Sequence, residues 1–313
     1  MVGKANLHEL AAGATGVNPW FGTPVNPIDR RLVPGGSSSG SAVAVATGVA
    51  DVAFGTDTAG SVRVPSACCG TVGLKTTWGR VPLGGVWPLA RSLDTVGPMA
   101  RDVAGVVAGM ELLEAGFAPG SELPAGIGRV RLPGTHPEVD AALDELLAAT
   151  GLPVSELRLP GWARAGDATL TVILAEAWEA DRHLLPEPDG IDPRITSMIA
   201  LGGSLAPAEL TAAICELDGW RRELARAIDR AGGTLALPTL LGPPPPLGEP
   251  DDGSLLLATA PVNGAGFPAL SVPLRATPRS GWAPSLQLVA SPGGEELLCA
   301  AGYMVEAAVA SLG

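Results

Sequence analysis

Short apolar runs, separated by segments rich in Gly and Pro, predict several buried strands along the chain. The predicted strands span residues 52–54, 71–75, 129–132, 154–159, 235–238, 269–273 and 285–290. Other segments repeat apolar residues at the spacing of a helix. The predicted helices span residues 38–50, 101–114, 137–150, most of 165–232, and 295–310. Strands and helices that alternate in this way favour an α/β fold.

The segment from Gly128 to Pro160 indicates how part of the sheet is connected. It contains a predicted strand, an amphipathic helix and a second strand, which is the pattern of a βαβ unit with helices on the faces of a sheet. No internal repeat and no linker-like stretch interrupts the chain, so residues 1–313 are predicted to form one domain. Near the N-terminus, Asn6 and Glu9 fit a capping box that opens a short helix.

Composition and charge narrow the functional classes. The 313 residues are 46% hydrophobic and carry a formal net charge of −12. Such a chain lacks the surplus of Lys and Arg that neutralises phosphates, so we expect neither nucleic acid nor a membrane as a partner. The apolar stretch 42–54 is too short to span a bilayer and contains Asp51, and no cationic leader opens the chain. A cytoplasmic protein is therefore predicted.

The four cysteines and three histidines do not follow a metal-binding pattern. There is no C-x-x-C pair and no Cys/His cluster at ligand spacing, so neither a metal nor a cofactor is predicted. Cys68 and Cys69 are adjacent; a redox pair is one interpretation, and two small buried thiols is the interpretation that we favour. Lys4 and Lys75 are the only lysines, so a mechanism that needs a lysine base has two candidates.

Two glycine-rich segments carry candidate chemistry. The run GGSSSGS occupies positions 35–41, and the run GTDTAGSVRVP occupies positions 55–65. Glycines let the backbone turn sharply and expose several N–H groups on one concave surface, where an oxyanion can bind. A hydroxyl at Ser61 in such a turn suits acyl transfer, whereas the simpler interpretation is a structural turn in which Ser61 caps a helix. Local composition alone favours the simpler interpretation.

An esterase-type site is a further interpretation of the first run. Residues 36–40 fit G-x-S-x-G, which would make Ser38 the nucleophile. That motif follows a strand and needs a histidine downstream, but the preceding segment is a poor strand. His8 is expected on the surface of the short N-terminal helix, His136 at a helix start and His183 at a charged helix end. We therefore do not favour a Ser-His-Asp triad.

In the two serine-bearing runs, Ser61 follows Ser37 by 24 residues, and the sequence GLK follows at 73–75. These motifs at this spacing resemble the amidase signature family. The resemblance continues on both sides, in GKAN at 3–6, SLDTVGP at 92–98, NGAGFPA at 263–269 and SLQL at 285–288. It implies an amidase-signature fold, a central mixed β-sheet flanked by helices on both faces. The signature core is expected at about residues 30–100, and a helical substrate-pocket region at about residues 165–232.

The resemblance also implies roles for individual residues. Ser61 matches the nucleophile, and Ser37 matches a bridging serine whose peptide bond to Gly36 is cis. The N–H groups of the oxyanion hole match those of Thr58, Ala59, Gly60 and the nucleophile itself. Asp57 and Arg63 match a pair that braces this loop. The implied activity is hydrolysis of the C–N bond of a small-molecule amide through a serine acyl-enzyme.

One part of the implied site has no counterpart in these residues. The family's catalytic lysine lies upstream at the end of an apolar strand, and this chain begins after that point, with the family's N-terminal elements missing. Lys4 and Lys75 match structural motifs, so we expect impaired activity. The alternatives are a non-catalytic homologue and the A subunit of a tRNA-dependent amidotransferase, from which residues 13–18 depart. Missing elements would expose apolar surface, which predicts self-association into a homo-oligomer.

Overall fold

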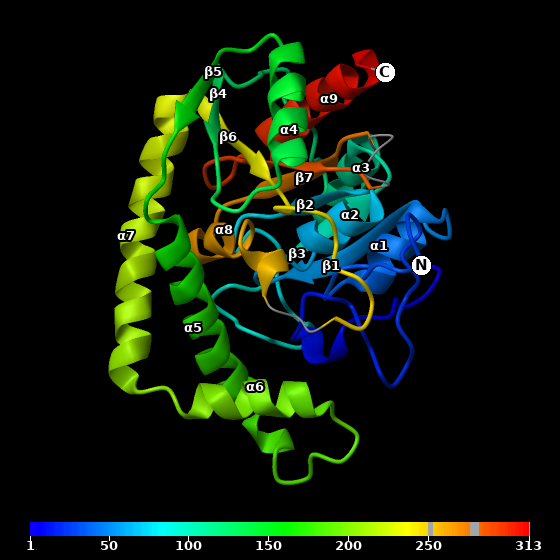
Figure 1. Cartoon of the computed structure of the whole chain (residues 1–313), viewed down its shortest axis with the longest axis vertical. Coiled ribbons are helices and arrows are strands. Elements are labelled where there is room, and N and C mark those ends of the chain that lie inside the picture. The colour runs from blue at the N-terminus through cyan, green and yellow to red at the C-terminus, as the bar shows by residue number, and fades with distance from the viewer. Residues whose placement is uncertain (250–252, 276–281, 313) are drawn as a thin grey trace.

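The structure is a computed structural model and describes residues 1–249, 253–275 and 282–312. Its centre is one eight-stranded sheet with the strand order β1-β3-β2-β7-β8-β6-β4-β5 (Figure 1). The strands are β1 (Val52–Asp57), β2 (Val72–Lys75), β3 (Thr95–Ala100), β4 (Gly126–Val130), β5 (Val154–Leu157), β6 (Gly233–Pro238), β7 (Ala269–Pro273) and β8 (Ser285–Val289). Every apolar run that was predicted to be a strand forms one, with bounds that differ by a few residues.

The sheet is mixed, as the sequence predicts. β4 pairs in parallel with β5 and with β6, which confirms the βαβ unit, and α4 (Pro137–Ala149) connects β4 to β5. The other neighbouring strands pair antiparallel. β1 lies at one edge of the sheet, and Phe54 in this strand is 39% exposed. The prediction of a buried strand at residues 52–54 is therefore wrong in this respect, because an edge strand has a neighbour on one side only.

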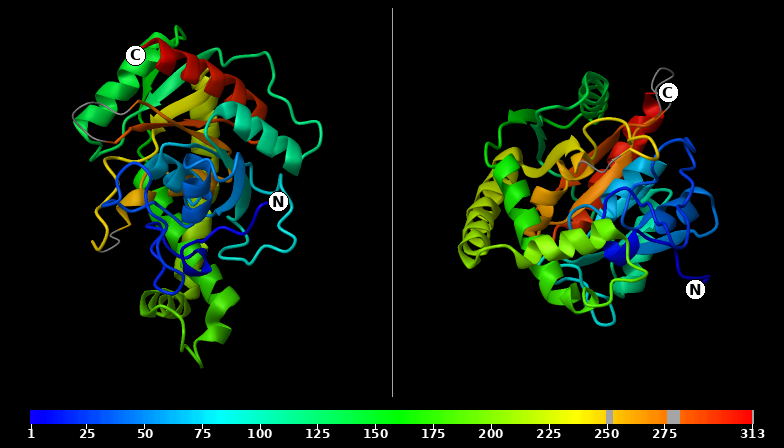
Figure 2. Two further views of the ribbon diagram at one scale, coloured as in Figure 1. Left: turned by 90° about the vertical axis from the view of Figure 1, so that its right-hand side faces the viewer. Right: turned by 60° about the horizontal axis from the view of Figure 1, so that its bottom comes forward.

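Helices cover both faces of the sheet, and successive residues of the central strands point to opposite faces. In β6, Leu235 and Leu237 belong to one hydrophobic cluster and Ala236 to the other. The first face is covered by α5 (Trp162–Asp181), α7 (Pro207–Ala231) and α8 (Ala260–Ala265), and the second by α3 (Val103–Leu113), α4 and α9 (Glu295–Ser311). The expected layered arrangement is confirmed (Figure 2).

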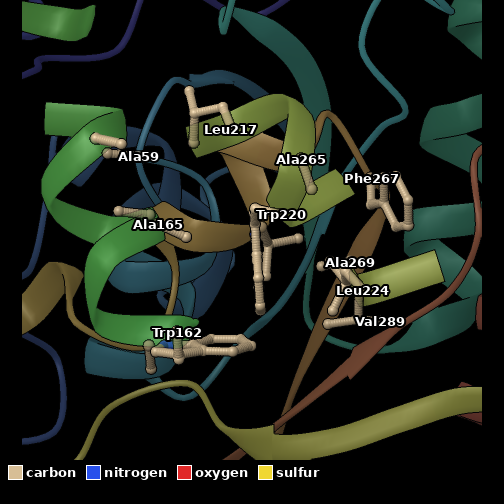
Figure 3. Packing of buried hydrophobic residues seen from close by; sticks show 14 of the residues in the cluster. Ala59, Trp162, Ala165, Leu217, Trp220, Leu224, Ala265, Phe267, Ala269 and Val289 are labelled. Carbon is tan, nitrogen blue, oxygen red and sulfur yellow. The ribbon is translucent and has the colours of Figure 1, made fainter. Parts of the chain in front are cut away.

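Two tryptophans anchor the helices of the first face. Trp162 in α5 and Trp220 in α7 meet edge to face, with ring centroids 5.5 Å apart. The indole N–H of Trp162 donates to the carbonyl oxygen of Leu257 at 2.9 Å, and that of Trp220 donates to Pro261 at 2.7 Å. Figure 3 shows both rings in the same buried space as side chains of α8 and the late strands. Ala59 belongs to this cluster, so the loop that contains it rests on the same packing.

Two elements were not predicted from the sequence. β3 contains Gly97 and Pro98, which are typical turn residues, yet it lies between β1 and β2 and pairs with both. A side chain at Gly97 would place its Cβ 1.8 Å from the carbonyl oxygen of Leu74, so the close strand pairing depends on this glycine. α8 is a short helix that ends at Gly266, with φ of 76°. Tertiary packing, not local pattern, decides both elements.

The predicted capping box near the N-terminus is wrong. The only helical turn there is a short 3₁₀ helix, η1 (Glu9–Ala11), within the described residues. The Asn6 side-chain amide donates to the carbonyl oxygen of Gly22 at 2.6 Å instead. The Glu9 carboxylate accepts the N–H of Asp192 at 2.8 Å. Both side chains are therefore used to hold distant segments, and neither caps a helix formed by its own sequence.

The three histidines lie in three different settings. His8 is buried, which corrects the prediction of a surface position. Gly13 makes room for its ring, since a Cβ there would lie 2.3 Å from the imidazole. His136 precedes α4, where its Nδ1 accepts the N–H of Glu138, and His183 lies in the 3₁₀ turn after α5, as predicted.

Helices α5, α6 (Pro193–Gly203) and α7 extend beyond the sheet at the lower end of the molecule in Figure 1. They form most of the helical region that was predicted at residues 165–232. No single helix in the described ranges is long and apolar enough to cross a membrane. α6 and α7 meet the length and composition criteria only as a pair, which is bent by 93°.

Candidate active site

The buried carboxylate of Asp57 holds the loop that connects β1 to the segment with Ser61. Asp57 ends β1 and is completely buried. One of its oxygens accepts the N–H groups of Val62 at 3.1 Å and Arg63 at 3.4 Å, at the first turn of α2 (Arg63–Cys69). Its two oxygens also bind the Arg63 guanidinium, at 3.0 Å from Nε and 2.9 Å from Nη2. Asp57 and Arg63 thus form a buried, bidentate ion pair.

The rest of the Arg63 guanidinium binds groups from the C-terminal part of the chain. Nη2 donates to Asn263 Oδ1 at 2.5 Å, and Nη1 donates to Gln287 Oε1 and, at 3.2 Å, to the carbonyl oxygen of Thr259. Burial by itself would raise the pKa of Asp57, but the charge and hydrogen bonds of Arg63 outweigh it and bring the pKa to about 2. The carboxylate is therefore ionised at neutral pH, and the ion pair persists.

The loop between β1 and α2 presents backbone N–H groups without partners. Within the described part of the chain, no hydrogen bond is donated by the N–H groups of Thr58, Ala59, Gly60 and Ser61. Other atoms of the loop are held in place: Thr58 Oγ1 donates to Asp94 Oδ1 at 2.6 Å, and the carbonyl oxygen of Ala59 accepts from Thr259 Oγ1 at 2.6 Å. Free N–H groups on a braced turn are the donors that an oxyanion needs.

Two glycines allow other segments to approach this loop closely. Gly60 has φ of 144°, and a Cβ there would lie 2.3 Å from Thr259 Oγ1. At Gly55 in β1, a Cβ would lie 2.3 Å from Ser38 Oγ. The absence of a side chain at these two positions lets Thr259 and the serine-rich segment pack against the loop.

The segment that carries Ser37 lies directly against the loop. The N–H of Ser38 donates to the carbonyl oxygen of Ser61 at 3.2 Å, and Ser41 Oγ donates to Phe54 at 2.9 Å. The peptide bond between Gly36 and Ser37 is cis. Ser37 Oγ is buried and has no hydrogen-bond partner among the described residues, the Ser61 hydroxyl included. A buried hydroxyl without a partner is uncommon in folded proteins, and here it lies where the bridging serine is expected.

Neither lysine forms a hydrogen bond with the two serines. Lys4 is exposed near the N-terminus. Lys75 is completely buried at the end of β2, and its Nζ donates to the carbonyl oxygens of Phe267 at 2.8 Å and Thr76 at 3.0 Å. Burial, and then the charge of Arg63, lower its pKa to about 7. Its contacts indicate that Lys75 ties β2 to the segment before β7.

Four polar residues that hold the loop were not connected with the site by sequence reasoning: Asp94, Thr259, Asn263 and Gln287. Asn263 and Gln287 lie 200 and 224 residues from Arg63 in the sequence. Each is a polar amide in an otherwise buried, largely apolar element, α8 or β8. A buried amide side chain needs a hydrogen-bond partner, so an Asn or Gln within an apolar element could have indicated a buried polar site.

Two adjacent cysteines lie in α2, close behind Ser61 in the sequence. Cys68 and Cys69 in α2 are free and buried, which confirms the prediction of two small buried thiols. Burial raises the pKa of both, that of Cys69 to about 12, so they stay protonated at neutral pH. In the ranges that the structure describes, no three His, Cys, Asp or Glu side chains are grouped to hold a metal ion.

Comparison with known proteins identifies the family and agrees with this fold. The family model named Amidase matches residues 1–299. The A subunit of the glutamyl-tRNA(Gln) amidotransferase of Symbiobacterium thermophilum is 42% identical over an alignment of 200 positions, which covers 56% of this chain and 41% of that protein. The 2-amino-5-chloromuconic acid deaminase of Comamonas testosteroni is 33% identical over an alignment of 335 positions, gaps included, which covers 99% of this chain and 72% of the deaminase. A solved amidase structure has a TM-score of 0.89 at 32% identity, covering 96% of this chain and 73% of that chain.

The chain therefore belongs to the amidase family, and its mixed sheet with helices on both faces is the fold of solved members of that family. The resemblance that was inferred from the serine-bearing runs is confirmed. The matched region spans less than half the length of the Symbiobacterium protein and about three quarters of the solved amidase.

Proposed function

We propose that this chain carries the nucleophile, the bridging serine and the oxyanion hole of an amidase, and that Ser61 attacks the carbonyl carbon of a small-molecule amide. Ser37 passes the proton of Ser61 toward a base, and the oxyanion binds the N–H groups of residues 58–61. The C–N bond then breaks, the amine leaves with the proton that Ser37 returns, and water hydrolyses the acyl ester. Asp57 and Arg63 keep the loop in shape.

One observation gives the strongest support to this proposal. The hydrogen bond from Ser38 N–H to the Ser61 carbonyl brings the two serine segments together, and the buried Ser37 hydroxyl beside it has no partner among the described residues. Four other buried hydroxyls, those of Ser39, Ser66, Thr71 and Thr234, also lack a partner among the described residues, so it is the position of Ser37 beside the Ser61 segment that supports the assignment. A proton relay needs a hydroxyl whose partners are the nucleophile and a base.

We further propose that the 313 residues alone hydrolyse amides slowly. A serine hydroxyl is a weak nucleophile unless a base activates it. Neither lysine forms a hydrogen bond with the two serines, because Lys4 is exposed near the N-terminus and the Lys75 Nζ donates to two backbone carbonyl oxygens. In serine proteases that lack part of the catalytic triad, substrate binding and the oxyanion hole still accelerate the reaction about 10³–10⁴-fold over the uncatalysed reaction in water. On this proposal, neither Lys4 nor Lys75 acts as the activating base.

Labelling with a fluorophosphonate, followed by peptide mass spectrometry, tests the assignment of the nucleophile. We expect slow labelling at Ser61, none in Ser61→Ala, and a further decrease in Ser37→Ala. Ser66→Ala is the matched control, because Ser66 Oγ is also buried and without a partner in the described residues, but lies in α2. A label on Ser38 would contradict the proposal and favour the esterase interpretation. A folded protein with no label at all would favour a non-catalytic homologue.

A second candidate is the amide-cleaving component of an amidotransferase. It is supported by the 42% identity to a protein of that name. In that case the ammonia released from the amide passes to a partner protein instead of being lost to water. Co-expression with the other amidotransferase subunits of the source organism tests it: a stable complex on size-exclusion chromatography supports this candidate, and separate elution contradicts it.

A further inference from the structure

A cavity of about 680 Å³ lies between the segment 85–91 and the C-terminal end of α5. Its volume lies in the range of small-molecule binding sites. Figure 1 shows this cyan loop, between β2 and β3, beside α5. The indole N–H of Trp87 donates to Asp181 Oδ1 at 3.1 Å, and Ser92 donates its N–H and its hydroxyl to the Glu176 carboxylate at 3.0 and 2.5 Å. The two walls are therefore tied together.

The lining combines an apolar wall with charges of both signs. The apolar wall consists of Val86, Trp87, Pro88 and Leu89. Arg91 forms no ion pair with any residue in the described ranges. Glu179 uses one oxygen for Arg182, at 3.1 Å, and Glu176 is held by Ser92. The cavity thus offers a cation and an anion that each retain binding capacity.

We propose that this cavity binds a zwitterionic ligand, an α-amino acid with a large flat apolar side chain. The ligand carboxylate pairs with the Arg91 guanidinium, which suits planar bidentate recognition. The ligand ammonium pairs with the second oxygen of Glu179. The apolar side chain lies on Trp87, which is 58% exposed and whose ring centroid is 6.3 Å from that of His183. A ligand without a carboxylate leaves Arg91 without an ion pair, and a ligand without an ammonium leaves the second Glu179 oxygen unused, because the first one binds Arg182.

The cavity adjoins the candidate active site through one buried carboxylate. Asp94 Oδ2 accepts the N–H of Leu89 at 3.1 Å, and Asp94 Oδ1 accepts from Thr58 Oγ1 at 2.6 Å. One side chain thus holds both the cavity wall and the loop that precedes Ser61. Binding of the amino acid itself needs neither the Ser61 hydroxyl nor a base, so it is separable from the proposed hydrolysis.

Isothermal titration calorimetry with three probes tests the proposal. L-Phenylalanine is the zwitterion, phenylalaninamide lacks the carboxylate, and N-acetylphenylalanine lacks the ammonium. The Ser61→Ala chain is used so that no probe is cleaved. We expect the zwitterion to bind about tenfold more tightly than either singly charged probe, since each charge-assisted contact is lost in one of them.

Substitutions assign each charge to its partner. Arg91→Met should weaken phenylalanine about tenfold and leave phenylalaninamide unchanged, whereas Glu179→Gln should weaken phenylalanine and leave N-acetylphenylalanine unchanged. Arg221→Met, on α7 and outside the cavity, is the control and should change no affinity. Equal affinity for the three probes, absence of binding, or equal effects of Arg91→Met and Arg221→Met would overturn the proposal. None of these results bears on the labelling of Ser61.

Discussion

The Arg63 guanidinium joins the loop before Ser61 to two segments that are distant in sequence, those of Asn263 and Gln287. It binds Asp57, Asn263 and Gln287, and it is completely buried. Replacement of one partner of such a pair leaves an uncompensated charge in the interior. The shape of the candidate oxyanion hole therefore depends on a contact that no residue of the loop itself makes.

Arg63→Met should lower the free energy of unfolding by about 3–5 kcal/mol, because the Asp57 carboxylate then stays buried without its partner. The double variant Arg63→Met/Asp57→Asn should recover part of this loss, since an amide carries no charge. Urea unfolding measures both. Arg101→Met, which breaks the exposed pair with Asp51, is the control and should cost less than about 1 kcal/mol. Additive effects of the two buried substitutions would contradict this account.

The buried Lys75 should make the free energy of unfolding increase with pH. Its folded pKa of about 7 lies below the ordinary 10.5, because burial and the Arg63 charge disfavour the ammonium. Between these values the unfolded chain binds a proton that the folded chain does not, so the free energy of unfolding rises with pH. Lys75→Met should lose this rise between about pH 7 and about pH 8.5 in urea unfolding. Lys4→Met, which removes the exposed lysine, should keep it; parallel profiles for Lys75→Met and wild type would refute the assignment.

At the scale of elements, the site is formed where α1 (Ser39–Ala46) and β1 approach each other, and Gly55 determines how closely they do so. A Cβ at position 55 would lie 2.3 Å from Ser38 Oγ and 2.7 Å from Ser38 Cβ. The serine segment would have to move away from the strand, and a displacement of this kind misplaces a catalytic group without unfolding the protein.

Gly55→Ala should therefore slow fluorophosphonate labelling of Ser61 about tenfold or more while the circular dichroism spectrum stays native. Ser38→Gly in the same chain should restore part of the rate, because it removes the clashing side chain. Gly84→Ala is the matched control, since nothing lies within 4 Å of its added Cβ. Equal labelling rates in Gly55→Ala and Gly84→Ala would show that the close approach of α1 to β1 does not affect the reactivity of Ser61.

At the scale of the whole molecule, apolar side chains near the N-terminus remain exposed. Trp20, Phe21 and Val25 are 51%, 84% and 60% exposed, and the Asn18 side chain accepts the N–H groups of the first two, which fixes the turn that presents them. We expect a mass above that of the monomer in light scattering, and a shift toward the monomer in Phe21→Ser. Leu112→Ser, which removes a 74% exposed side chain on α3, should leave the mass unchanged. A wild-type monomer would contradict the expected self-association.

The sequence predicted most of the sheet because its strands are apolar runs bounded by turn residues. It did not predict β3, because Gly97 and Pro98 signal a turn and only the pairing with two neighbours makes this segment a strand. It misplaced His8, because the burial of that ring depends on the bare Cα of Gly13. The local sequence pattern thus predicted most of the strands. The position of β3 and the burial of His8 depend instead on close contacts between segments that are distant in sequence.

The candidate site could be predicted only in part. The two serines and the glycine-rich loop form short motifs at a fixed spacing, so a resemblance could find them. Asn263 and Gln287 could not be assigned, because their partner Arg63 lies 200 or more residues away and no local pattern joins them. The unpartnered Ser37 hydroxyl is likewise visible only in three dimensions.

The central claim is that these residues supply a nucleophile and an oxyanion hole without a base. The pH profile of fluorophosphonate labelling at Ser61, from about pH 6 to about pH 10, tests it most directly. Without an internal base the rate should rise throughout this range, because only hydroxide can remove the serine proton. A rate that is half-maximal near pH 7 and then constant, the profile expected if Lys75 with its pKa of about 7 were the base, would contradict the claim.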